Sequence, residues 1–82
     1  MRYTVTWDPS AEAELMAIWL GAPDRQAVTD AANEIDRLLA NDPQLKGQPF
    51  YGDRILVASP LAVTFSVSPD DRRVRVLQVW HR

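Results

Sequence analysis

The feature that most constrains the fold is a set of apolar residues at helical spacing between Pro23 and Pro43. The set comprises Ala27, Val28, Ala31, Ala32, Ile35, Leu38 and Leu39. Spacings of three and four residues place these side chains on one side of an α-helix. Asp24 can cap the start of this helix, and Asn41-Asp42-Pro43 ends it, because proline cannot continue the helical hydrogen bonds. The sequence therefore predicts an amphipathic helix with one side turned towards a core.

A strand and a first helix precede it. Residues 2–7 alternate polar and apolar side chains, with Trp7 among the apolar ones, as expected for a half-buried strand. Asp8 can serve as N-cap and Pro9 as the first helical residue. The apolar positions of this helix are Ala11, Leu15, Ile18 and Trp19. Gly21 ends the helix, and the short link to the next one predicts an antiparallel pair.

The second half of the chain predicts strands. Residues 44–53 read as a loop, because Gly47, Pro49 and Gly52 break regular structure. Strand-like runs follow at 54–59, 61–67 and 73–81, joined by proline-containing turns. In the last run Val74, Val76, Gln78 and Trp80 share one face, and Arg73, Arg75, Leu77, Val79 and His81 share the other. Apolar character changes face at Val76-Leu77. This change predicts either a bulge or a sheet that is covered differently at its two ends.

Together these elements predict one α+β domain over residues 1–82 with the order β-α-α-β-β-β. Two antiparallel helices should pack on one face of a small antiparallel sheet. We expect the first strand to join that sheet at an edge or beside the last strand.

Composition excludes several kinds of site. The 82 residues contain no cysteine, so disulfides, thiol nucleophiles and cysteine-bound zinc are ruled out. We expect no cofactor or metal. The first ten residues lack the apolar run of a signal peptide, and no stretch approaches the roughly 20 apolar residues of a membrane span. We therefore expect a cytoplasmic protein.

Charge is distributed unevenly along the chain. Residues 8–42 carry eight acidic and two basic side chains, whereas residues 43–82 carry six basic and three acidic ones. This division predicts a bipolar surface, although two ordinary solvated faces would give the same count. The sequence pI of about 5.1 is low for a protein that must bind a polyanion.

Four segments in this order resemble the RelE/ParE superfamily of small toxins from bacterial type II toxin-antitoxin modules. They read "WDPSAEAEL", "IWLGAPDRQAVTDAANEIDRLLANDP", "LKGQPFYGDR" and "PLAVTFSVSPDDRRVRVLQVWHR". The resemblance implies a growth inhibitor restrained by a cognate antitoxin. It leaves two activities open: ribosome-dependent mRNA cleavage in the RelE-like branch, and non-enzymatic inhibition of DNA gyrase in the ParE-like branch. A degenerate partner-binding module or a homodimer without toxin activity is a further alternative.

The resemblance also implies candidate site residues. RelE-like proteins place basic residues on the middle strands of a concave sheet face and a basic, histidine or tyrosine side chain at the end of the last strand. Carried over to this chain, Arg54, His81 and Arg82 match these positions and would be catalytic. Arg75 is added from the residues themselves: it shares a face of the last run with His81, so we expect it to bind phosphate. Ala62 stands where the RelE-like pattern has an arginine.

These residue types suit such chemistry, but each of them also has an explanation that involves no function. Imidazole can transfer protons near neutral pH, and arginine can bind phosphate through two parallel donors. Equally, His81 and Arg82 could be solvated terminal residues, and Arg75 could cover the sheet with its aliphatic stem. We expect Trp7 and Trp19 in the core. Trp80 could be either a core residue or a side chain that stacks on a nucleic-acid base.

Overall fold

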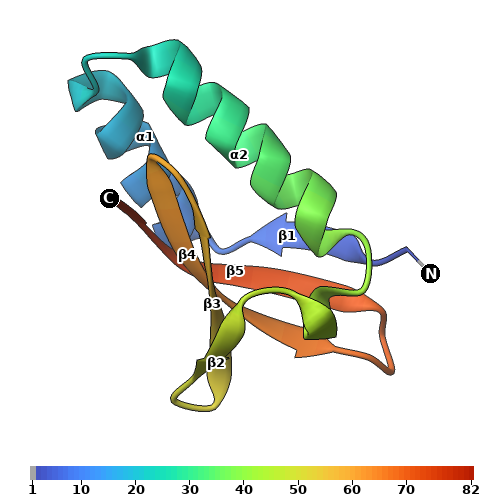
Figure 1. Ribbon diagram of the computed structural model, residues 1–82. Coiled ribbons are helices and arrows are strands. Elements are labelled where there is room, and N and C mark those ends of the chain that lie inside the picture. Colours follow the sequence, from blue (N-terminus) through green and yellow to red (C-terminus); the bar gives the residue numbers. More distant parts are fainter. Residues whose placement is uncertain (1) are drawn as a thin grey trace.

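The computed structural model describes residues 2–82, which form two helices, one short 3-10 helix and five strands (Figure 1). In chain order these are β1 (Thr4–Trp7), α1 (Pro9–Gly21), α2 (Arg25–Leu39), η1 (Pro43–Leu45), β2 (Gln48–Phe50), β3 (Asp53–Ala58), β4 (Leu61–Ser68) and β5 (Arg73–His81). Both helices pack against one sheet, which confirms the predicted α+β class. Neither helix within residues 2–82 has the length and apolar character that crossing a membrane requires.

The sheet has the strand order β1-β5-β4-β3-β2. β1 lies at one edge and pairs with β5 in parallel, and the other neighbours are antiparallel. The predicted place of the first strand is therefore confirmed. β2 and η1 lie in the segment predicted as a loop, so that prediction is wrong. Gly47 and Gly52 mark the turns there, but the backbone between them, including Pro49, still pairs with β3.

A bulge in β5 sets which side chains face the helices. Thr64 pairs with Gln78 and Phe65 pairs with Val76, so Leu77 is the extra residue. The predicted bulge at this place is confirmed. It shifts the alternation by one residue. Val79 therefore lies on the same buried face as Val76, not on the opposite face as the simple alternation predicts.

The core lies between this face of the sheet and the helices. α2 buries Val28, Ala31, Ile35 and Leu39, whereas α1 buries only Ala11. Asp24 caps α2 as predicted, because its side chain accepts a hydrogen bond from the Ala27 N–H at 3.1 Å. Asp8 makes no such cap at the start of α1, so the predicted role of its side chain as N-cap acceptor is wrong.

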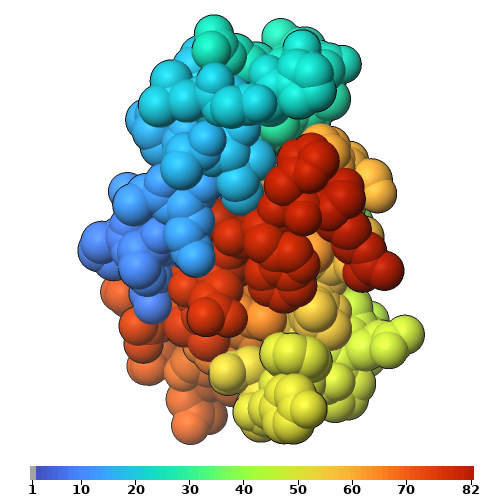
Figure 2. All heavy atoms as spheres, turned by 90° about the vertical axis from the view of Figure 1, so that its left-hand side faces the viewer, coloured from blue at the N-terminus to red at the C-terminus, as the bar shows by residue number. Residues whose placement is uncertain are grey.

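The outer edge of β5 is covered by two different elements. β1 pairs with residues 73–76 only. Beyond them the Val79 N–H donates to the Glu14 carboxylate of α1 at 3.3 Å. Figure 2 shows the end of β5 (red) at the surface beside α1 (blue). A side chain of α1 thus satisfies an edge donor that no strand reaches.

Candidate functional site

Arg75 and His81 lie on opposite faces of the sheet. His81 pairs with Leu61, whose side chain is in the core, and His81 itself lines a hollow with Pro23 and Ala27 on the helix side. Arg75 pairs with Ser66 on the face away from the helices. The expectation that Arg75 and His81 share a face is therefore wrong, and the bulge at Leu77 is the cause. We call the face away from the helices the open face. It comprises Ala62, Thr64 and Ser66 of β4 with Trp80, Gln78 and Arg75 of β5.

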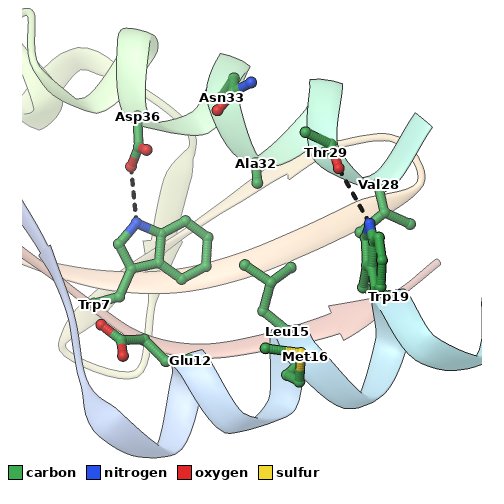
Figure 3. A pocket seen from close by; sticks show the side chains of 10 residues that line it. All are labelled: Trp7, Glu12, Leu15, Met16, Trp19, Val28, Thr29, Ala32, Asn33 and Asp36. Carbon is green, nitrogen blue, oxygen red and sulfur yellow. Dashed lines mark hydrogen bonds between the residues drawn. The ribbon is translucent and has the colours of Figure 1, made fainter. Parts of the chain in front are cut away.

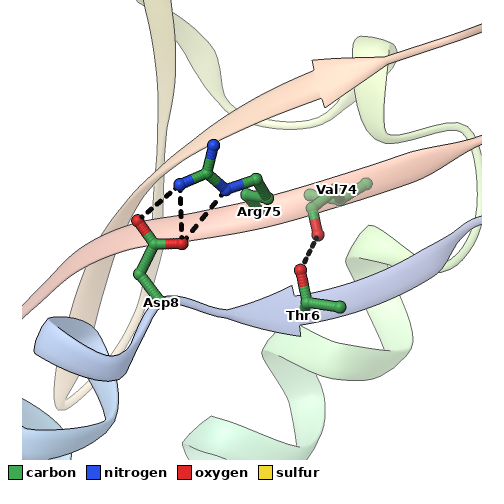
Figure 4. A network of polar contacts seen from close by, with 4 residues as sticks. All are labelled: Thr6, Asp8, Val74 and Arg75. Atoms are coloured by element: carbon green, nitrogen blue, oxygen red, sulfur yellow. Dashed lines mark hydrogen bonds and ion pairs between the residues drawn. The ribbon is translucent and has the colours of Figure 1, made fainter. Parts of the chain in front are cut away.

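The Arg75 guanidinium is bound to a carboxylate (Figure 4). Its Nη2 lies 2.9 Å and 3.0 Å from the two Asp8 oxygens, and its Nε donates to Oδ1 at 3.0 Å. The parallel pairing of β1 with β5 brings these residues together, although 67 positions separate them. A bidentate pair of this kind uses the donors that a phosphate would need. Arg75 is thus neutralised where the prediction placed a phosphate.

Arg54 is bound to the backbone of the preceding loop. Its Nε donates to the Lys46 carbonyl at 2.8 Å, and its Nη2 donates to the Gly47 carbonyl at 3.2 Å. Gly47 has a φ of +63°, and a Cβ there would lie 2.1 Å from the Ile55 carbonyl oxygen. The loop therefore lies directly against β3, and Arg54 fixes it. Arg54 therefore stabilises the loop at Lys46 and Gly47.

The centre of the open face carries no cation among the described residues that form it. Ala62 is fully buried, and its cross-strand partner is Trp80. The Arg82 side chain is exposed beyond the end of β5, and the backbone N–H of Arg82 donates to the Pro60 carbonyl at 2.7 Å. The candidates Arg54, Arg75, His81 and Arg82 are consequently not gathered around one point. Their assignment to catalysis and phosphate binding stays a prediction.

One ion pair lies on the exposed side of α2, where hydrogen bonds from Arg37 lower the pKa of Glu34. Within residues 2–82 no three His, Cys, Asp or Glu side chains come close enough together to hold a metal ion. The geometry thus offers no assembled acid-base centre in this part of the chain.

A hollow lined mainly by apolar side chains lies between the helices (Figure 3). We call it the interhelical groove, and its volume is about 570 Å³. β1 and α1 contribute Trp7, Glu12, Leu15, Met16 and Trp19, and α2 contributes Val28, Thr29, Ala32, Asn33 and Asp36. Its floor is apolar, and its polar groups stand on the rim. Met16 in particular is 59% exposed, although it is a large apolar side chain.

Two tryptophans span the groove from α1 and β1 to α2. The Trp7 indole N–H donates to Asp36 Oδ1 at 2.8 Å, and that of Trp19 donates to Thr29 Oγ1 at 3.2 Å. Arg25 lies 4.7 Å from the centre of the Trp19 ring. Both indoles pack against the core but are only partly buried, so the expectation that they are core residues holds in part. The groove was not predicted from the sequence, although Met16 is an apolar residue of α1 outside the predicted apolar positions of that helix.

Comparisons with known proteins identify the fold. No family model matches the sequence, and no curated protein matches it significantly. Among solved structures, the RelBE2 toxin-antitoxin complex of Mycobacterium tuberculosis contains a chain with a TM-score of 0.83 and 17% identity, over 100% of this chain and 93% of that one. A chain of the chromosomal ParDE system of P. aeruginosa gives a TM-score of 0.76 and 24% identity, over 98% of this chain and 96% of that one.

A third likeness is to the archaeal RelE-RelB complex from Pyrococcus horikoshii, with a TM-score of 0.69 and 15% identity, over 100% of this chain and 97% of that one. At these identities the comparisons concern backbone architecture. The chain has the RelE/ParE-type toxin fold, as its sequence predicted.

Proposed function

We propose that this chain, which has the RelE/ParE-type fold, is the toxin of a type II toxin-antitoxin module. In this proposal a cognate antitoxin restrains it, and it acts in the cytoplasm by binding its target without cleaving RNA. The observation that supports binding over cleavage is the ion pair of Arg75 with Asp8, on the face opposite His81. RNA cleavage needs proton transfer and cationic stabilisation at the same phosphate.

Electrostatics supports the same proposal. The chain has a net charge of −2, and the centre of its open face is occupied by Ala62 and Trp80. Binding to ribosomal RNA depends largely on Lys and Arg side chains that neutralise phosphates. A protein target such as DNA gyrase makes no such demand. We therefore place gyrase before the ribosome among the candidate targets.

Ribosome-dependent mRNA cleavage is the second candidate function. Its supporting observations are the likeness to chains of RelBE complexes and the exposure of both His81 and Arg82 at the end of β5.

One expression experiment tests both candidates. Induction of the chain without a partner should arrest growth, and primer extension on cellular mRNA should show no new 5′ ends. His81→Ala and Arg82→Ala should arrest growth as the parent does. Cleavage products that disappear in these variants would establish the ribonuclease instead. Normal growth at a verified protein level would refute the toxin proposal altogether.

The target needs a separate measurement. Purified chain added to a DNA supercoiling reaction should inhibit gyrase if gyrase is the target. Inhibited translation in a cell-free extract, with supercoiling unaffected, would redirect the search to the ribosome.

A further inference from the structure

We infer that a hollow beside the β2–β3 turn binds the side chain of one arginine from a partner protein. We call it the aromatic hollow. It is lined by Phe50 of β2, Tyr51 of the turn, Asp53 of β3, Thr64 of β4, and Leu77 and Gln78 of β5. The assignment of the partner to the target of the toxin rests on the proposed function. The preference for a guanidinium rests on the aromatic hollow alone.

The strand register brings these side chains together. Asp53 pairs with Phe50 across the β2–β3 hairpin, and Thr64 pairs with Gln78 on the open face. The hairpin turn lies away from both helices (Figure 1). The volume of the aromatic hollow is about 350 Å³, near the lower limit for sites that bind small ligands. It therefore fits one side chain, not a helix or a strand.

Tyr51 occupies a backbone position that suits a tyrosine poorly. It forms the two-residue hairpin turn with Gly52, and φ is +47° at Tyr51 and +85° at Gly52. Turns with positive φ at both positions favour asparagine, aspartate or glycine at the first one, because a larger side chain crowds the backbone there. The Tyr51 side chain gains little packing in return, since the residue is 95% exposed. An unfavourable backbone position that folding does not explain points to a binding function.

The two aromatic rings of the hollow are arranged so that a cation can lie on them. Phe50 and Tyr51 meet edge to face, with ring centres 4.8 Å apart and planes at 79°. Within residues 2–82 the arginine that lies over an aromatic ring is Arg25, at 4.7 Å from the centre of the Trp19 ring. The rings of the hollow thus carry no cation from the described chain. Guanidinium groups stack on such rings more readily than other charged groups do.

Asp53 supplies the negative charge for such a ligand. It is half-buried, and the ion pairs formed within residues 2–82 involve other carboxylates, those of Glu34 and Asp8. The neighbouring Arg54 points to the opposite face of β3, where loop carbonyls accept its hydrogen bonds. A free carboxylate can accept two parallel N–H donors from one guanidinium. Asp53 is therefore available to an arginine from outside the chain.

Thr64 distinguishes this hollow from an ordinary surface depression. It is a polar residue with only 4% exposure, and its hydroxyl makes no hydrogen bond to another of residues 2–82. No fully enclosed polar side-chain atom in this part of the chain lacks a partner, so the Thr64 hydroxyl must reach the hollow. Buried polar groups in proteins are nearly always paired. The Thr64 hydroxyl and the Gln78 amide oxygen can accept the guanidinium donors that Asp53 leaves free.

The charge of the hollow favours a protein over RNA as the source of the ligand. A nucleic-acid base could also stack on Tyr51. However, Asp53 would repel the phosphates beside that base, and none of the side chains that line the hollow is cationic. Binding of a nucleic acid depends largely on cations that neutralise its phosphates.

A titration with three small probes tests the chemistry. The probes are the capped tripeptides Gly-Arg-Gly, Gly-Lys-Gly and Gly-citrulline-Gly, added to the isotope-labelled full-length chain and followed by NMR. Citrulline has almost the shape of arginine but no charge. The arginine peptide should shift the Gln78 side-chain amide and the backbone amides of Tyr51 and Asp53. The lysine peptide should bind at least about threefold more weakly, and the citrulline peptide at least about tenfold more weakly.

Tyr51→Asn separates binding from folding. Asparagine followed by glycine is the favoured pair for this turn, so the variant should be at least as stable as the parent in urea unfolding. It removes the ring, however, and should weaken the arginine peptide at least about fivefold. A variant that gains stability and loses binding cannot owe its loss to misfolding.

Two further variants test the polar groups. Asp53→Asn should weaken the arginine peptide about tenfold, because it removes the charge with little change of shape. Thr64→Val should weaken it about threefold, through loss of the hydroxyl. Asp70→Asn is the matched control for charge, since Asp70 is exposed in the β4–β5 turn outside the hollow. It should leave binding unchanged.

Four results would overturn the inference. No shift at any soluble concentration of the arginine peptide would mean that the hollow binds no guanidinium, and equal binding of citrulline would exclude recognition by charge. A single-stranded RNA pentamer that binds through Tyr51 more tightly than the arginine peptide would make the hollow a base-stacking site. A dimer of the chain that Tyr51→Asn dissociates would make a second copy the occupant.

The assignment to the target of the toxin has its own readout. If the chain arrests growth, Tyr51→Asn and Asp53→Asn at equal protein level should weaken the arrest, and Asp70→Asn should not. Full arrest by variants that no longer bind the arginine peptide would remove the target from this hollow. Peptide binding without growth arrest would refute the proposed function and leave the arginine site standing.

Discussion

The two helices lie on the same sheet but use their apolar residues differently. α2 places four of its apolar residues in the core, whereas α1, which is richer in apolar residues, buries only Ala11 completely. In α2 these residues form one stripe that the sheet can cover. In α1 they are spread around the helix, so one sheet face cannot cover them all. The uncovered part of α1 is what makes the interhelical groove apolar.

The largest expected effect tests whether α2 carries the stability. Ile35 is fully buried, so Ile35→Ala should lower the free energy of unfolding by about 2–5 kcal/mol, through lost burial and the cavity left behind. Leu20→Ala in α1 should change it by no more than about 0.5 kcal/mol, because Leu20 is 57% exposed. Urea unfolding of both variants measures the difference. Equal losses would break the distinction between the helices.

The starts of the helices give a second contrast. Asp24 caps α2 through the Ala27 N–H, so Asp24→Ala should lower the free energy of unfolding by about 1 kcal/mol. Asp24→Ser should restore most of this loss, since serine is also a good N-cap. Urea unfolding again provides the measurement. Failure of serine to restore stability would mean that the charge of Asp24, not its hydrogen bond, is what matters.

Asp8 at the start of α1 should behave differently, because its carboxylate is bound to Arg75 and makes no cap. Asp8→Ala should cost about 0.5–1 kcal/mol, given that both side chains are partly exposed. In an Arg75→Ala background this cost should become smaller, whereas the cost of Asp24→Ala should not. A double-mutant cycle measures the coupling. Additive losses at positions 8 and 75 would show that the pair contributes nothing to stability.

Asp8 and Asp24 also show how far sequence reasoning reaches. Both stand before a helix, and the local pattern predicts a cap for each. A side-chain cap forms only at Asp24, because the Asp8 carboxylate binds Arg75 of a strand 67 positions away. Local signals located helices and strands well: the predicted strands 54–59, 61–67 and 73–81 are observed at 53–58, 61–68 and 73–81. They could not identify a partner that arrives through the sheet.

The candidate site depended on the same long-range information. The bulge at Leu77 was visible as a change of apolar face, but its effect on His81 depends on register, which residue spacing leaves open. β2 was missed because three turn-forming residues outweigh a strand of only three residues. The groove was missed because an apolar helix position does not reveal whether a neighbour covers it. Met16 and Leu15 have the same residue class, yet only Met16 is largely exposed.

The smallest expected effect concerns the outer side of α2, where Arg37 donates to Glu34 at 3.0 Å. This contact lowers the pKa of Glu34, and α1 contains no basic residue that could do the same within that helix. A carboxyl whose pKa is lower in the folded state stabilises the protein above its unfolded pKa, and the contribution is lost as the pH falls through the folded pKa. Arg37→Gln should raise the pKa of Glu34 towards its ordinary value, as followed by NMR titration of its side-chain carboxyl. It should also flatten slightly the acid side of the stability profile, while leaving stability near neutral pH almost unchanged, because exposed pairs contribute little. A Glu34 titration identical in parent and variant would mean that the pair does not form in solution, and the outer sides of the two helices would then be electrostatically alike.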